Sequence, residues 1–173
     1  GHVEAGLRTG DKFQPFPEEI NRRIADVISD LHFAPTETNR RNLLNEGISD
    51  ETIVVTGNTV IDALLMVVER ARRYVLGKWG PSLNGRRVIL VTAHRRENFG
   101  QPLQEICQAL AQIAREYASD VHIIYPVHLN PNVWKPVHAA LSGIPNVTLT
   151  EPLGYKEFVG LMNRAYLVLT DSG

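Results

Sequence analysis

Short apolar runs alternate with helix-like segments from residue 86 onward, and this alternation constrains the fold more than any other feature of the sequence. A short, continuous apolar run is typical of a strand that is buried on both faces. Strands that alternate with helices predict an α/β fold with a parallel sheet and right-handed crossovers. The expected strands are Val88–Val91, Val121–Tyr125, Val147–Leu149 and Tyr166–Leu169, and the expected helices are residues 102–116, 131–141 and 155–164.

The first half of the chain has the same alternation with shorter strands. Leu31–Ala34 and Thr52–Thr56 are predicted strands, because each contains β-branched or aromatic residues and is followed at once by a turn-forming proline or glycine. A helix is expected to begin at Pro17, a second after Thr36 as its N-cap, and a third to cover residues 60–75.

Residues 77–85 contain three glycines and Pro81 with little apolar content, so they are predicted to link two domains, 1–76 and 86–173. The chain starts without methionine and stops at Asp171-Ser172-Gly173, just after an apolar run. A strand in this position normally continues into a helix that covers the sheet. The sequence is therefore expected to be an internal piece of a longer protein, with part of each domain.

Composition excludes several classes of function. The net charge is −1, so no general field favours nucleic acid or an anionic membrane. No apolar stretch approaches the roughly 20 residues that span a bilayer, and no paired histidine or cysteine spacing indicates a metal site. Cys107 is the single cysteine, which permits no internal disulfide and favours a reducing, cytoplasmic location.

Polar side chains gather where the predicted strands of the second half end. Thr92–Gly100 follows the first strand and contains His94, Arg95, a second arginine, a glutamate and an asparagine. His128 follows the second strand, and Ser172-Gly173 follows the last. Because parallel strands end at one edge of the sheet, where ligands bind in open α/β folds, these residues predict a site for an anionic, polar ligand.

Simpler interpretations remain open for several of these residues. The charged residues after His94 are also compatible with a solvated run, and His128 is equally compatible with packing of its proline-flanked loop. In the first half, Glu18, Asn21 and Arg22 share a helical face. Glu18 also suits the positive end of a helix dipole, and residue chemistry alone favours that simpler role.

Six stretches, taken in order, resemble the non-hydrolysing UDP-N-acetylglucosamine 2-epimerase family. The resemblance runs nearly from end to end of the chain, and the order of the six motifs makes it specific although each alone is weak. The stretches are Gly1–Thr9, Pro15–Arg22, Thr56–Ala63, Thr92–Gly100, Tyr125–Val133 and Thr170–Gly173.

This resemblance implies a GT-B-like α/β fold, in which two Rossmann-like domains with parallel sheets face a cleft. It implies an isomerase that interconverts UDP-GlcNAc and UDP-ManNAc through elimination and re-addition of UDP, with a 2-acetamidoglucal intermediate. No cofactor or metal is implied, and the partners are the two nucleotide sugars, UDP and a second copy in a homodimer. Such enzymes serve the biosynthesis of cell-surface polysaccharides.

By the same resemblance, Glu4 and Glu18 look like catalytic carboxylates and His94 like the histidine that contacts UDP near the leaving oxygen. Phe158 is similar to the aromatic residue that packs on uracil, and Ser172 and Gly173 to the start of the diphosphate-binding turn. Arg95 and His128 match positions that contact an allosteric second UDP-GlcNAc in regulated bacterial members.

The family has further catalytic and binding residues that are expected to lie outside this sequence, so the 173 residues alone are predicted to be inactive. Three alternatives use the same fold or ligand: a GT-B glycosyltransferase, a hydrolysing epimerase that releases free ManNAc, and a nucleotide-sugar binding module without catalysis. The motifs that contain Glu4 and Glu18 argue against the glycosyltransferase.

Overall fold

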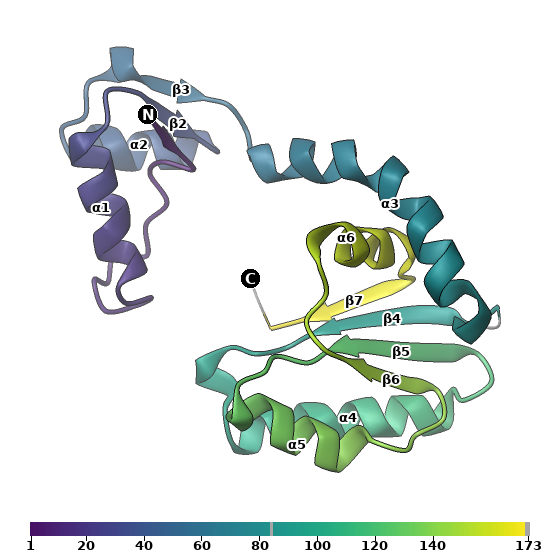
Figure 1. Cartoon of the computed structure of the whole chain (residues 1–173). Coiled ribbons are helices and arrows are strands. Elements are labelled where there is room, and N and C mark those ends of the chain that lie inside the picture. The colour runs from purple at the N-terminus through teal and green to yellow at the C-terminus, as the bar shows by residue number, and fades with distance from the viewer. Residues whose placement is uncertain (84, 172–173) are drawn as a thin grey trace. The chain divides into compact units, whose positions relative to one another are not determined.

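The chain folds into two α/β units, each with its own parallel sheet (Figure 1). The computed structural model describes residues 1–83 and 85–171. Unit 1 is Gly1–Leu65 and unit 2 is Met66–Gly173. All strand pairs are parallel, so the expected α/β class with parallel sheets is confirmed.

Unit 1 has a small sheet of three short strands in the order β1-β2-β3. Thr36 is the expected N-cap of the second helix, because its Oγ1 accepts a hydrogen bond from the Asn39 amide at 3.3 Å. Gly6 permits the close approach of the first loop to this helix, since a Cβ there would lie 2.2 Å from the Asn39 oxygen. The elements are β1 (His2–Val3), α1 (Glu18–Ile28), β2 (His32–Ala34), α2 (Glu37–Asn45), η1 (Asp50–Thr52) and β3 (Ile53–Val55).

Unit 2 has a sheet of four strands in the order β6-β5-β4-β7. All four strands and all three helices predicted for this half are confirmed, with ends that differ by at most one residue. The elements are β4 (Arg87–Thr92), η2 (Arg96–Asn98), α4 (Gln101–Glu116), β5 (Val121–Pro126), α5 (Pro131–Leu141), β6 (Val147–Thr150), α6 (Tyr155–Arg164) and β7 (Leu167–Thr170).

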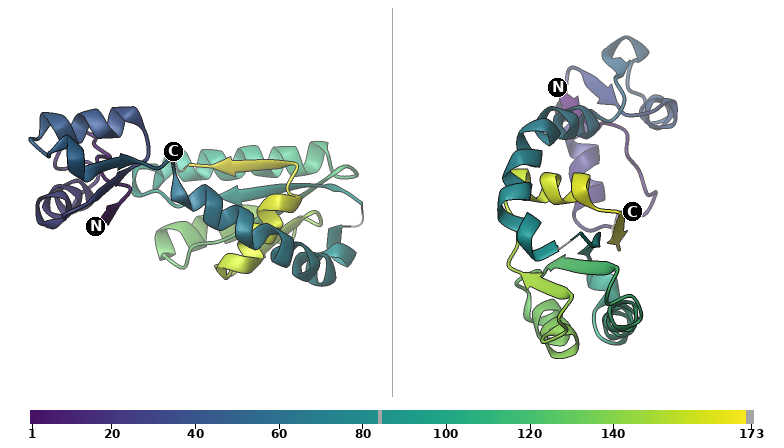
Figure 2. Two further views of the ribbon diagram at one scale, coloured as in Figure 1. Left: turned by 90° about the horizontal axis from the view of Figure 1, so that it is seen from above. Right: turned by 90° about the vertical axis from the view of Figure 1, so that its right-hand side faces the viewer.

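Helices cover both faces of the sheet of unit 2, as the right-hand view in Figure 2 shows. The two central strands β4 and β5 alternate their side chains between two apolar clusters. Ile89 and Ile123 pack with α4 and α5, whereas Leu90 and Ile124 pack with α6 and with Leu83 near the end of α3 (Thr59–Leu83). Burial on both faces explains why these strands are continuous apolar runs.

The strand order of unit 2 reverses between β4 and β7. Counted from β4, the order is 3-2-1-4, as in Rossmann-like sheets, and ligands of such sheets bind beyond the carboxyl ends of the strands at this reversal. Thr92 and Thr170 are the last register partners of β4 and β7. The loop that carries His94 and the residue Asp171 therefore leave the sheet side by side.

Two features differ from the sequence-based expectation. Helix α3 continues to Leu83 and so includes most of the stretch predicted as a linker, and contacts divide the chain after Leu65. The helical spacing of Ile20, Ile24, Val27 and Ile28 predicts that they form the buried stripe of α1. The helix instead buries Glu19 and Asp26, while Ile24, Val27 and Ile28 are exposed. Partners for the two buried carboxylates, given below, account for this polar inner face. No helix in the described part of the chain combines the length and apolar content that a bilayer crossing requires.

Candidate functional site

Asp171 holds the loop that follows β4. Its Oδ2 atom accepts hydrogen bonds from the backbone amides of His94 at 3.0 Å and Arg95 at 2.8 Å, and from Asn98 Nδ2 at 3.0 Å. Oδ1 is buried and has no hydrogen-bond partner among the described residues. One carboxylate at the end of β7 thus fixes the backbone of the neighbouring strand exit, including the residue expected to contact UDP.

Asp171 is held in its charged form. Burial acts to raise the pKa of its carboxyl group, but hydrogen bonds from the Asn98 amide and from the Arg95 and His94 backbone outweigh burial and lower the pKa below its ordinary value. An ionised acceptor also makes stronger hydrogen bonds than a neutral one. The loop that carries His94 is therefore anchored most firmly near neutral pH.

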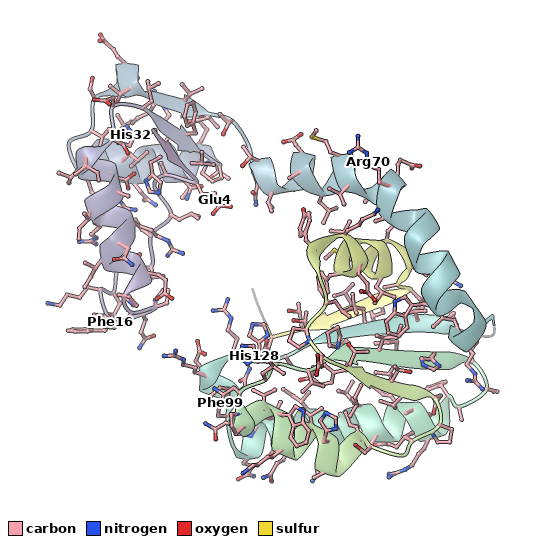
Figure 3. All side chains as sticks on the ribbon, viewed as in Figure 1. Glu4, Phe16, His32, Arg70, Phe99 and His128 are labelled. Atoms are coloured by element: carbon pink, nitrogen blue, oxygen red, sulfur yellow. The ribbon has the colours of Figure 1, made fainter. Side chains whose placement is uncertain are left out.

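His94 and His128 come together at the ends of β4 and β5. Their rings stack with centroids 5.5 Å apart and planes inclined by 11°. Both side chains are exposed, and Figure 3 shows His128 at the same edge of the sheet as Phe99 of the first loop. His128 Nδ1 accepts a hydrogen bond from the Asn130 amide at 3.1 Å, so its Nε2 is left for a ligand.

A buried tyrosine stiffens this edge of the sheet. The Tyr125 hydroxyl donates a hydrogen bond to the Ala93 carbonyl oxygen at 2.7 Å, next to His94. Burial raises the pKa of Tyr125 above its usual range, which keeps the hydroxyl protonated as a donor. The sequence analysis did not single out this residue, although a tyrosine that ends a buried apolar run needs a hydrogen-bond partner.

The other expected binding residues of unit 2 are placed differently. Phe158 lies on α6 and packs, half-buried, against the cluster that contains Leu90 and Leu161. Phe158 is therefore not fully covered by the core. Ser172 and Gly173 lie outside the described residues.

Unit 1 has an open pocket of about 310 Å³ that is lined by residues of β1 and α1. Its lining confirms that Glu18, Asn21 and Arg22 share one helical face, adds Ala25 to that face, and includes His2 from β1. No cluster of three or more histidines, cysteines or acidic residues suited to a metal ion occurs within residues 1–83 and 85–171. The polar groups of this pocket are suited to hydrogen bonding and proton transfer with an uncharged or anionic ligand.

Glu4 is not among the residues that line this pocket. Its φ angle is +62°, so the extended backbone that would put Glu4 on the same side as His2 ends at Val3. Glu4 is exposed just beyond β1 (Figure 3). A positive φ angle in a residue other than glycine is uncommon and is typical of a constrained, functional position.

A network of charged side chains lies beside the pocket, and the sequence analysis missed it. Asp26 Oδ1 pairs with His2 Nδ1 at 2.5 Å, and Oδ2 accepts from Arg8 Nη2 at 2.6 Å. Arg8 also donates from Nε and Nη2 to Glu46 at 2.8 and 2.7 Å. The available signal was helical spacing, because Asp26 follows Glu18 by eight residues and so lies on the same side of α1.

The arginine is the centre of this network. Hydrogen bonds to Glu46 and Asp26 raise the pKa of Arg8 despite the opposing effect of burial. The Arg8 hydrogen bond is also the main cause that lowers the pKa of Glu46. A further carboxylate, Glu19, is fully buried and accepts hydrogen bonds from the amides of Thr9 and Gly10 at 3.3 and 3.4 Å. Together these groups fix the loop between β1 and α1.

Comparison with known proteins assigns the family. The family model described as UDP-N-acetylglucosamine 2-epimerase matches residues 1–173. The UDP-N-acetylglucosamine 2-epimerase of Salmonella typhimurium strain LT2 is 55% identical over 100% of this chain and 47% of the relative. The chain thus spans about half the length of the curated relatives it matches.

Two solved structures match the whole chain as well. The Neisseria meningitidis UDP-GlcNAc 2-epimerase bound to UDP-GlcNAc is 44% identical with a TM-score of 0.86 over 48% of its length. The S. aureus MnaA–UDP co-structure is 42% identical with a TM-score of 0.88 over 46% of its length. These matches confirm the expected GT-B-like fold class with parts of two Rossmann-like domains. The chain belongs to the UDP-N-acetylglucosamine 2-epimerase family.

Proposed function

We propose that this chain is part of an enzyme that interconverts UDP-GlcNAc and UDP-ManNAc without a cofactor. The observation that carries the proposal is the match of the whole chain to an epimerase solved with UDP-GlcNAc. The ordered strand exits at the reversal between β4 and β7 support it, because this is where Rossmann-like sheets bind nucleotides. The complete protein is a cytoplasmic homodimer.

The chemistry requires acid and base groups together with stabilisation of a departing diphosphate. A base removes the proton from C2 of the sugar, the bond from C1 to the UDP oxygen breaks, and the electron pair leaves with UDP. The resulting 2-acetamidoglucal then takes up UDP at C1 and a proton at C2 from the opposite face. General acid–base groups contribute about 10²- to 10⁴-fold to such steps.

The roles of individual residues follow from the family motifs and agree with the local geometry of each unit. Glu18 and Glu4 supply carboxylates near the sugar, and the Glu18 pocket in unit 1 has room for polar groups of a sugar. His94 contacts the leaving oxygen of UDP from a loop that Asp171 holds rigid. Phe158 packs on the uracil through its exposed part, and Ser172 and Gly173 bind the diphosphate.

The allosteric role belongs to Arg95 and His128, which contact a second UDP-GlcNAc. The stacking of His128 on His94 supports this proposal, because a ligand that moves the His128 ring also changes the environment of His94. This direct contact offers a short physical route between the two sites within unit 2.

The test is incubation of the complete protein that contains this chain with UDP-GlcNAc in deuterated water and no acceptor. We expect UDP-ManNAc with deuterium at C2. Glu18→Gln should lower kcat by about 10²- to 10⁴-fold, whereas Glu37→Gln, an exposed acid on α2 of the same unit, should leave kcat unchanged. The 173 residues alone should form no UDP-ManNAc.

Each alternative predicts a different result in the same assay. Release of UDP and free ManNAc would indicate a hydrolysing epimerase, and turnover that depends on an added acceptor would indicate a glycosyltransferase. Binding of UDP-GlcNAc without any product or deuterium exchange would indicate a binding module. Any of these three results would overturn the proposal.

A further inference from the structure

Asp26 is a buried carboxylate whose two oxygens have different partners. Its side chain is only 2% exposed, Oδ1 faces His2 Nδ1 at 2.5 Å, and Oδ2 faces Arg8 Nη2 at 2.6 Å. A buried carboxylate is unfavourable unless charged or polar donors compensate for its lost hydration. The imidazole and the guanidinium provide these donors, so the position of each partner depends on Asp26.

The main chain at Asp26 also has a histidine partner. Its carbonyl oxygen lies 2.9 Å from Nε2 of His32, whose ring is also buried. His32 and His2 are register partners on the adjacent strands β2 and β1. Two neighbouring histidines thus hold one residue of α1, one through its carbonyl and the other through its carboxylate.

The partner of His2 determines which ring nitrogen carries the proton. An ionised carboxylate only accepts hydrogen bonds, so His2 Nδ1 must be the donor. In the neutral ring, Nε2 is then the acceptor. The ring is 17% exposed and lines the pocket that contains Glu18. With the proton on Nδ1, Nε2 is the ring nitrogen that can accept a hydrogen bond from a ligand in that pocket.

We propose that Asp26 is a positioning residue that holds His2 with Nε2 as an acceptor for a sugar hydroxyl beside Glu18. The identity of the ligand as a nucleotide sugar rests on the proposed function above. With its proton on Nδ1, the ring accepts one hydrogen bond from the hydroxyl at Nε2 and so orients the sugar relative to the Glu18 carboxylate. Arg8, which Glu46 holds from the other side, keeps the Asp26 carboxylate in the orientation that serves His2.

The variant Asp26→Asn changes the His2 tautomer in a predictable direction. Arg8 has only donors, so the amide oxygen of the new side chain must turn toward Arg8. The amide NH₂ group then faces His2 Nδ1, which must become the acceptor. His2 Nε2 consequently carries the proton and presents a donor to the pocket, although the shape of residue 26 is almost unchanged.

Nitrogen-15 NMR of the complete protein with labelled histidine tests this step without any activity measurement. We expect wild-type His2 to carry its proton on Nδ1 and the Asp26→Asn variant to carry it on Nε2. Glu46→Gln is the matched control, because it removes a carboxylate from the same arginine without touching His2, and it should keep the wild-type tautomer. A proton on Nε2 in the wild type would overturn the proposal even if Asp26→Asn failed to fold.

Kinetics of single and double variants test whether Asp26 acts through His2. Asp26→Asn and His2→Ala should each lower kcat/KM for UDP-GlcNAc by roughly 10- to 100-fold, the range for a lost hydrogen bond at a buried site. The double variant should be no slower than His2→Ala alone. Additive losses would show that Asp26 supports the fold independently and would overturn the proposal. A wild-type protein without turnover would instead refute the proposed function, while the NMR result would still decide the tautomer.

Discussion

The two units hold their functional side chains by different physical means. In unit 1, Asp26, Arg8 and Glu46 form side-chain ion pairs that orient His2. In unit 2, Asp171 binds backbone amides and one asparagine, and an apolar sheet supports the loop from behind. The first arrangement depends on charges that must be paired, and the second depends on main-chain geometry and burial.

The apolar core of unit 1 is also smaller than that of unit 2. The described cluster of unit 1 has only four buried residues: Ala5, Ala34, Leu43 and Ile53. Unit 2 buries two clusters, one on each face of its sheet. A unit with little apolar burial has little driving force to set side-chain positions by packing. Paired charges therefore contribute more to fixing side-chain positions in unit 1 than in unit 2.

The largest expected effect is the loss of packing in unit 2. Leu90 on β4 is fully buried between α6 and α3. Leu90→Ala should lower the free energy of unfolding by about 3 kcal/mol, within the 2–5 kcal/mol typical of buried leucines. Urea denaturation followed by circular dichroism measures the change. Val27→Ala in unit 1 is the control, because Val27 is 80% exposed and its truncation should cost less than about 0.5 kcal/mol.

A comparable loss for the two variants would contradict the contrast between the units. It would show that the exposed apolar face of α1 contributes as much free energy as the central strand of unit 2. A loss confined to Leu90→Ala would confirm that burial of β4 against α6 and α3 stabilises the strand from which the His94 loop leaves the sheet.

The next effect is local and concerns the loop that Asp171 anchors. Asp171→Asn replaces an ionised acceptor with a neutral amide, which weakens the hydrogen bonds from the His94 and Arg95 amides. We expect these two amides to exchange with deuterium about 10- to 100-fold faster, as for a loss of roughly 1–3 kcal/mol. NMR-detected hydrogen exchange measures the rates.

Glu97→Gln is the matched control for this loop. Glu97 lies in η2 between Arg95 and Asn98, is exposed, and carries the same charge as Asp171. Its substitution should leave exchange at His94 and Arg95 unchanged. Equal acceleration in both variants would mean that net charge near the loop, rather than the Asp171 hydrogen bonds, protects these amides.

Unit 2 was the more predictable half because its signal is local in sequence. Runs such as Val88–Val91 are typical of strands that are covered on both faces, and parallel connection then places their ends on one edge. The grouping of His94 with His128 follows from that geometry. The stacking of their rings does not, because it depends on rotamers that two separate loops impose.

Unit 1 was less predictable because its partners are distant in sequence. Asp26 meets Arg8, 18 residues away, and Arg8 meets Glu46, 38 residues away. Helical spacing relates Asp26 to Glu18 but identifies no partner for the buried carboxylate, and the apolar residues Ile24 and Val27 of the same helix are exposed. The conformation of Glu4 was also beyond reach, because a positive φ angle at glutamate reflects surrounding contacts rather than local preference.

The smallest expected effect is a change of pKa with salt concentration, which should differ between the Glu46–Arg8 ion pair and the Asp171 hydrogen bonds. The pKa of Glu46 is lowered mainly by its hydrogen bond from the Arg8 cation, whereas the Asp171 pKa, which burial alone would raise, is lowered by hydrogen bonds from neutral amides. In 1 M NaCl the Debye length falls to about 3 Å, which screens a partly exposed ion pair. The pKa of Glu46 should therefore rise toward its ordinary value, and that of Asp171 should change less.

Carboxyl carbon-13 shifts, recorded against pH at low and high salt, measure both groups in one sample. Because each folded-state pKa lies below the unfolded value, near 4.3 for Glu and 3.9 for Asp, each group stabilises the fold above that pH. This stabilisation is lost as pH falls through the lower folded pKa. High salt should reduce the contribution of Glu46 but largely preserve that of Asp171, and Arg8→Met should abolish the salt response of Glu46. Equal responses of the two carboxylates would mean that ion pairing and backbone binding are not distinct ways of ordering these units.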